Sequence, residues 1–106
     1  MYSFIETKLF TRLSDDLLSD DALAELQGFL MENPEAGDVV PGSGGVRKLR
    51  WAVRGRGKRG GLRVIYFVKT TQGVIFLLTV YPKNVRDTIP AHVLRQIRKE
   101  AEDAEA

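Results

Sequence analysis

Five side chains in the second half of the sequence have types that suit the cleavage of RNA. They are Lys48, Arg50, Arg63, Tyr81 and Lys83. A lysine or tyrosine can help to remove the proton of an RNA 2′-hydroxyl, and arginines can stabilise the charge that develops on the adjacent phosphate. Like-charge repulsion within such a group favours the neutral form of a lysine, which is the form that acts as a base. This chemistry needs no metal ion, and it requires RNA because DNA lacks the hydroxyl.

The charges are unevenly distributed along the chain. No Asp or Glu lies between Asp38 and Asp87, and the same interval contains eleven cations. The first 38 residues carry a net charge of −7 and the last 20 a net charge of −2, so the overall charge of +2 conceals a strongly basic middle. Such an asymmetry favours a polyanionic partner. Charge alone does not separate a binding site from a solvated surface that merely attracts polyanions.

Length and composition limit the class of protein. The 106 residues, 43% of them hydrophobic and 28% charged, predict one soluble globular domain over residues 1–106. The absence of cysteine excludes disulfides and a cysteine nucleophile and fits a reducing cytoplasm. No apolar run approaches the roughly 18 residues of a membrane helix, and the N-terminus has no signal-peptide pattern. The basic middle lacks clustered carboxylates or histidines, so we expect neither a metal nor a small-molecule cofactor.

The apolar spacing predicts a strand, two helical segments, a three-stranded meander and a last helix, in that order. The expected strands are residues 2–6, 46–53, 62–69 and 74–81. Thr7 should cap a short helical turn that ends at Ser14, residues 19–32 should form a helix, and another should open at residues 88–90. Residues 35–45 are expected to be a loop, and the acidic tail 100–106 to fray. The order predicts an α+β fold, a small mainly antiparallel sheet with helices packed on one face and a free basic face.

Strand alternation gathers the candidate residues on that free face. Lys48 and Arg50 alternate with the apolar Leu49 and Trp51, and Arg63 joins them if its strand has the same pleat phase. The loop 54–61 would add four cations at the rim, and Tyr81 and Lys83 would reach the same rim from the last strand. These four are Arg54, Arg56, Lys58 and Arg59. Trp51 and Tyr66 could stack on bases, but we expect both to pack in the core.

Two segments carry a resemblance to a known family. They are ENPEAGDVVPGSGGVRKLRWAVRGRGKRGGLRVIYF, residues 32–67, and FLLTVYPKN, residues 76–84. The sequence resembles the RelE/ParE superfamily of toxins from type II toxin–antitoxin systems, and specifically the HigB-like toxins of its RelE-like branch. The resemblance implies a RelE-like microbial ribonuclease-type fold. It also implies cleavage of mRNA in the ribosomal A site and inhibition by a cognate HigA-like antitoxin protein.

The resemblance assigns roles to individual residues. It implies that Arg63 contacts the scissile phosphate, that Lys48 and Arg50 are the basic pair one strand earlier, and that Lys83 follows the last strand. Arginine is a poor base, so Lys48 is the better general-base candidate of that pair. The tyrosine near the family's C-terminus has no counterpart in residues 88–106, so its role is absent or is taken by Tyr81. By their positive charge, and not by the resemblance, we also expect RNA or ribosome binding by Arg47, Arg50, Arg54, Arg56, Lys58 and Arg59.

Two other functions remain open from the sequence. The first is a ParE-like inhibitor of DNA gyrase, which we rank lower because such members generally lack the full cationic set that this chain keeps. The second is a non-catalytic RNA-binding module. Such a module would show salt-sensitive RNA binding that survives Lys48→Ala, and it would yield no cleaved product.

Overall fold

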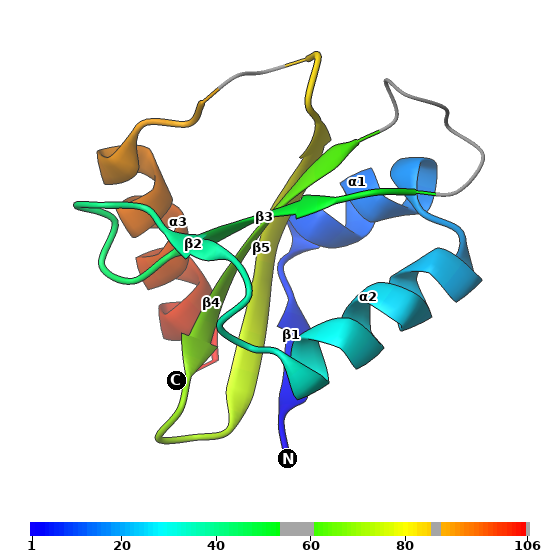
Figure 1. Ribbon diagram of the computed structural model, residues 1–106. Helices are drawn as coiled ribbons and strands as arrows, with labels where there is room; N and C mark the ends of the chain where they lie inside the picture. The colour runs from blue at the N-terminus through cyan, green and yellow to red at the C-terminus, as the bar shows by residue number, and fades with distance from the viewer. Residues whose placement is uncertain (54–60, 86–87, 106) are drawn as a thin grey trace.

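The computed structural model describes residues 1–53, 61–85 and 88–105. The strands are β1 (Ser3–Glu6), β2 (Asp38–Val39), β3 (Arg47–Trp51), β4 (Leu62–Lys69) and β5 (Val74–Pro82). The helices are α1 (Lys8–Leu17), α2 (Asp20–Glu32) and α3 (Ala91–Ala104). The strands form one sheet in the order β1-β5-β4-β3-β2, in which only the β1–β5 pair is parallel (Figure 1). The predicted α+β class and mainly antiparallel sheet are confirmed.

Local capping signals position the first two helices. The hydroxyls of Thr7 and Ser19 each accept the backbone N–H three residues later, at 2.9 and 3.1 Å, as predicted. The predicted break at Ser14 is wrong, because α1 continues to Leu17. Ser14 is buried and its hydroxyl donates to the carbonyl of Thr11 at 3.2 Å, so its polar group is satisfied within the helix.

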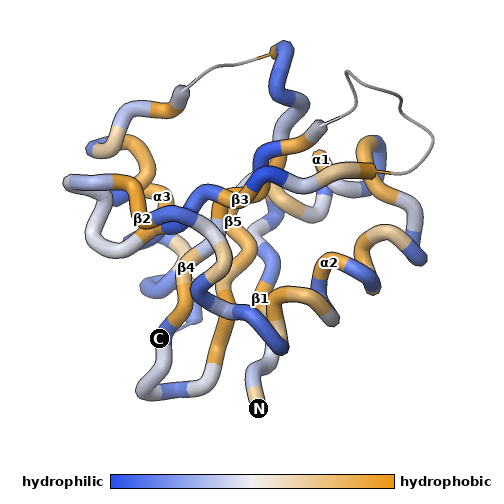
Figure 2. Tube along the Cα trace, in the orientation of Figure 1, coloured by the Kyte–Doolittle hydropathy of each residue, from blue (hydrophilic) through white to orange (hydrophobic). Residues whose placement is uncertain are grey.

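The helices cover both faces of the sheet, which corrects the prediction of a single covered face. Leu77 of β5 packs in one apolar cluster with Phe10 of α1 and Leu26 of α2, and its neighbour Leu78 packs in another with Leu94 of α3. Figure 1 accordingly shows α1 and α2 on one side of the sheet and α3 on the other. The reason is that β5 is apolar on both faces, as its colour in Figure 2 shows, so each face needs helical cover.

A bulge in β5 decides which residues share a face near the end of this strand. The pairing of β4 with β5 shifts between Ile65 and Tyr66, which leaves Leu78 as an extra residue. Beyond such a bulge the alternation of side chains is displaced by one. Tyr81 therefore packs on the α3 side, whereas Leu77, four residues earlier, packs on the α1–α2 side.

Two aromatic residues belong to the core, as predicted. Tyr66 is fully buried in the α1–α2 cluster, and Trp51 is half-buried at the edge of the same cluster. The Trp51 ring lies 5.2 Å from the ring of Phe29, centroid to centroid. These positions leave neither ring available as a stacking platform on the basic face.

Candidate active site

The cationic residues of β3 and β4 lie side by side on the α3 face of the sheet. Arg50 pairs with Arg63 in the β3–β4 register, and Arg63 pairs with Tyr81 in the β4–β5 register. Paired residues on adjacent strands project to the same face, with strands about 4.8 Å apart. Lys48 pairs with Ile65, whose side chain lies in the α3 cluster, so Lys48 shares this face. The predicted pleat phase of Arg63 is confirmed.

α3 covers only part of this face, and the uncovered part contains a hollow. The cationic hollow, about 400 Å³ in volume, is lined by Ala36, Asp38, Lys48, Leu49, Arg50 and Arg63. Arg50 is exposed, and Lys48 and Arg63 are half-buried. In the part of the chain that the structure describes, this lining brings together three cations and the carboxylate of Asp38. Cations at such an open site can bind a phosphodiester and neutralise charge that develops on it.

Tyr81 and Lys83 lie at the margin of this arrangement. The ring of Tyr81 is part of the cluster beneath α3 and is 7% exposed. Lys83 is exposed just past β5, where its backbone N–H donates to the carbonyl of Gly61 at 3.1 Å. This bond places Lys83 at the end of the sheet next to the start of β4, beyond the Arg63–Tyr81 pair.

Arg47 is separated from the other candidates. It precedes Lys48 in β3 and therefore projects to the opposite face. Its Nη1 atom donates to the carbonyl oxygens of Glu35 and Gly37, at 3.2 and 2.7 Å. These bonds fix the chain that leads into β2. The remaining predicted binding residues, Arg54, Arg56, Lys58 and Arg59, lie outside the described residues.

Residues 35–45 contribute more to the site than the predicted loop implied. Residues 38–39 form β2, and Asp38 pairs with Lys48 across the β2–β3 edge. The buried hydroxyl of Tyr66 accepts the N–H of Gly37 at 2.8 Å and donates to the carbonyl of Pro34 at 2.8 Å. Burial raises the pKa of Tyr66, so the hydroxyl stays protonated and able to donate. A two-residue strand and a hydrogen bond over 29 residues have no local sequence signal, so sequence reasoning missed Asp38.

α3 holds the loop between β2 and β3 from the other side. The guanidinium groups of Arg95 and Arg98 donate to the carbonyls of Gly42 and Gly44. Both glycines have φ near +80°, a conformation that suits glycine. Arg95 and Arg98 therefore fix the loop that leads into β3.

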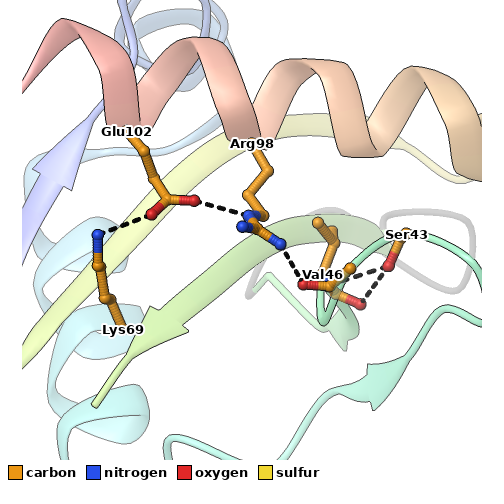
Figure 3. A network of polar contacts seen from close by, with 6 residues as sticks. Ser43, Val46, Lys69, Arg98 and Glu102 are labelled. Carbon is orange, nitrogen blue, oxygen red and sulfur yellow. Dashed lines mark hydrogen bonds and ion pairs between the residues drawn. The ribbon is translucent and has the colours of Figure 1, made fainter. Parts of the chain in front are cut away.

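An ion-pair network anchors the C-terminal half of α3. Glu102 lies between Arg98 and Lys69, at 2.7 and 2.8 Å (Figure 3). The hydrogen bonds from Lys69 and then Arg98 lower the pKa of Glu102. The Arg98 guanidinium also lies 4.6 Å from the centroid of the Phe67 ring. The predicted fraying is therefore wrong for residues 100–104, which continue the helix, and Glu102 ties this turn to Lys69 of β4.

The part of the chain that the structure describes has neither a metal-binding cluster nor a membrane-spanning helix. No group of three or more His, Cys, Asp or Glu side chains within 1–53, 61–85 and 88–105 is arranged to hold a metal ion. Within those same ranges, none of the helices is both long enough and apolar enough to cross a membrane.

Comparisons with known proteins assign the family. The family described as "RelE toxin of RelE / RelB toxin-antitoxin system" matches residues 4–106. A solved structure of a mutant of the E. coli toxin RelE in the free state is similar, with a TM-score of 0.61 and 19% sequence identity. The match covers 97% of this chain and 96% of that chain, and at this identity it establishes the fold. The fold is that of a RelE-type toxin. The chain belongs to the RelE toxin family and is the toxin of a toxin–antitoxin system.

Proposed function

We propose that this toxin is a HigB-like mRNA interferase, an endoribonuclease that cleaves mRNA in the ribosomal A site without a metal ion. The observation that carries the proposal is the register pair Arg50–Arg63 in the cationic hollow, with Lys48 beside it. Two guanidinium groups on adjacent strands can contact the non-bridging oxygens of one phosphate at the same time. Membership of the RelE toxin family supports the same assignment.

The reaction would be an in-line displacement at phosphorus. The 2′-oxygen attacks the adjacent phosphate, the bond from phosphorus to the 5′-oxygen breaks, and the products are a 2′,3′-cyclic phosphate and a 5′-hydroxyl. Arg50 and Arg63 stabilise the extra negative charge of the pentacovalent state. The ribosome contributes by presenting the mRNA backbone in a strained or extended form that the open hollow can reach.

The partners follow from this proposal. The substrate is mRNA on the ribosome, so the toxin would act in the cytoplasm. A cognate HigA-like antitoxin would inhibit it, either by covering part of the basic face or by preventing entry into the A site through its bulk.

The test is cell-free translation of a defined mRNA, with 5′ ends mapped by primer extension. The reactions contain wild-type protein, Arg63→Ala, or Arg12→Ala, and a further wild-type reaction omits ribosomes. Arg12 is exposed on α1, on the far side of the sheet, so its variant controls for the loss of one positive charge. We expect wild-type and Arg12→Ala to cut only with ribosomes, and Arg63→Ala to cut about 100-fold to 1000-fold more slowly.

Three outcomes would overturn the proposal. If the wild-type protein leaves the mRNA intact and translation unaffected, gyrase inhibition becomes the favoured function, and a DNA supercoiling assay tests it. Salt-sensitive binding to RNA without a cleaved product indicates a binding module. Equal cutting by wild-type and Arg63→Ala would remove the cationic hollow from the reaction.

A further inference from the structure

Among the described residues, the lining of the cationic hollow includes one carboxylate, and the reaction proposed above gives it no role. Asp38 of β2 is exposed and pairs with Lys48 of β3, so the two side chains project to the same face. It lines the cationic hollow together with Arg50 and Arg63. In the sequence, Asp38 is the last acid before the basic middle, and only the pairing of β2 with β3 brings it among the cations.

The proposed cleavage needs a base that can accept the 2′-hydroxyl proton at neutral pH. Arginine side chains remain protonated in proteins, and lysines ordinarily titrate near pH 10, whereas aspartates are ionised above about pH 4. Lys48 has a negative neighbour as well as positive ones, because it pairs with Asp38 across the β2–β3 edge. Among the described residues that line the cationic hollow, Asp38 is the one side chain of a type that carries an available lone pair at neutral pH. We propose that Asp38 is the general base, which leaves Lys48 to contact the phosphate; this rests on the proposed function.

The position of Asp38 suits an in-line reaction. Asp38 lies on β2, the edge strand, while Arg50 and Arg63 lie on β3 and β4, and Lys83 lies just past β5. Lys83 is separated from Asp38 by three strand spacings, about 14 Å, and by a further offset along the strands, so it lies beyond the arginine pair. The proton of the 2′-hydroxyl passes to the Asp38 carboxylate on one side of the phosphate. The departing 5′-oxygen, on the other side, takes a proton from water, and solvent returns Asp38 to its starting state.

Both backbone polar groups of Gly37, the residue before Asp38, are hydrogen-bonded. These bonds hold the backbone at Asp38 in place, as a general base requires. The N–H of Gly37 donates to the Tyr66 hydroxyl at 2.8 Å, and the carbonyl of Gly37 accepts from Arg47 at 2.7 Å. Gly37 is buried, and Tyr66 and Arg47 approach it from β4 and β3. Asp38 is thus an exposed carboxylate on a rigid support, and such preorganisation lowers the cost of proton transfer.

The test measures single-turnover cleavage at the mapped site on programmed ribosomes, with toxin in excess, between about pH 6 and pH 9. The variants are Asp38→Asn, Asp38→Glu and Glu35→Gln. Glu35 is a nearby exposed acid outside the lining of the cationic hollow, so its variant controls for the loss of one negative charge. We expect Asp38→Asn to cut about 100-fold more slowly or worse, Asp38→Glu to recover part of the rate, and Glu35→Gln to stay within about twofold. The wild-type rate should not rise about tenfold per pH unit over this range, as it would with a lysine as the base.

Other results would refute the role of Asp38. A wild-type rate that rises about tenfold per pH unit, with Asp38→Asn retaining that slope, would make a lysine the base. An Asp38→Asn rate within about threefold of wild type would exclude Asp38 as the base. If the variant is slow only because it no longer co-sediments with ribosomes or no longer folds, as judged by its melting temperature, Asp38 has a binding or structural role. Failure of the wild-type protein to cut at all would instead refute the proposed function.

Discussion

Replacement of Tyr66 by Phe tests whether the hydroxyl that supports β2 stabilises the fold. Tyr66 is fully buried, and its hydroxyl bonds both the N–H of Gly37 and the carbonyl of Pro34, each at 2.8 Å. Tyr66→Phe removes both hydrogen bonds while it keeps the ring. Gly37 is buried, so its N–H is left without its partner, whereas Pro34 is half-buried and water can reach its carbonyl. An unsatisfied buried donor costs about 1–3 kcal/mol, and loss of the second bond adds about 0.5–1 kcal/mol.

We therefore expect Tyr66→Phe to lower the free energy of unfolding by about 2–3 kcal/mol. For a domain of this size such a loss lowers the melting temperature by roughly 8–20 °C. Urea denaturation followed by circular dichroism measures the free energy, and a thermal melt measures the temperature. Tyr2→Phe is the matched control, because no hydrogen bond of the Tyr2 hydroxyl occurs within the described residues; it should change stability by less than about 0.5 kcal/mol. A Tyr66→Phe protein as stable as the control would refute the inference that this hydroxyl holds the β2 segment.

Two further perturbations have effects whose sign follows from the geometry. A Cβ at Gly37 would lie 2.9 Å from Cε1 of Tyr66 and 3.1 Å from the backbone carbonyl carbon of Lys48, so Gly37→Ala should destabilise by about 1–3 kcal/mol in urea. A Cβ added at Gly28 of α2 would have no neighbour within 4 Å, so Gly28→Ala should instead stabilise the fold by about 0.5–1 kcal/mol. Equal effects of the two substitutions on stability would contradict this reasoning. Because its pKa is lowered in the folded protein, Glu102 contributes to folding stability. This contribution is complete above the ordinary carboxyl pKa and is lost as the pH falls through the pKa of Glu102 in the folded state. Glu102→Gln should therefore melt a few degrees below wild type at pH 7, and this difference should shrink as the pH falls below the ordinary carboxyl range. A difference that stays constant throughout acid titration would exclude the ion pairs as its cause.

Much of the fold could be predicted because the relevant signals are local. Thr7 and Ser19 carry their capping function in their own type and in the residues that follow them. The alternation of Lys48 and Arg50 with Leu49 and Trp51 fixed which side of β3 is polar before any partner strand was known. Such periodicity depends only on the geometry of one strand or one helix, so a single sequence is enough to recognise it.

The residues of the candidate site could be predicted only in part from local sequence patterns. Arg63 and Arg50 belong to adjacent predicted strands, so their proximity needed only the register, which the structure confirms. Arg47 was grouped with them by charge, although its guanidinium is bound to the carbonyls of Glu35 and Gly37 on the other face. Asp38 was absent from the prediction because its partner is ten residues away, across a glycine-rich turn that reads as a loop.

The sequence by itself thus determined the α+β class, the helix starts, the polar and apolar sides of β3 and the concentration of positive charge, because each depends on near neighbours in the chain. Only the tertiary structure decided that α3 covers part of the basic face and that a bulge in β5 turns Tyr81 toward α3. It also decided that the Asp38 carboxylate of β2 lies among the cations. These features arise from contacts between residues far apart in sequence. They depend on the free energy of side-chain packing and strand pairing, which cannot be predicted from one residue and its near neighbours in the chain.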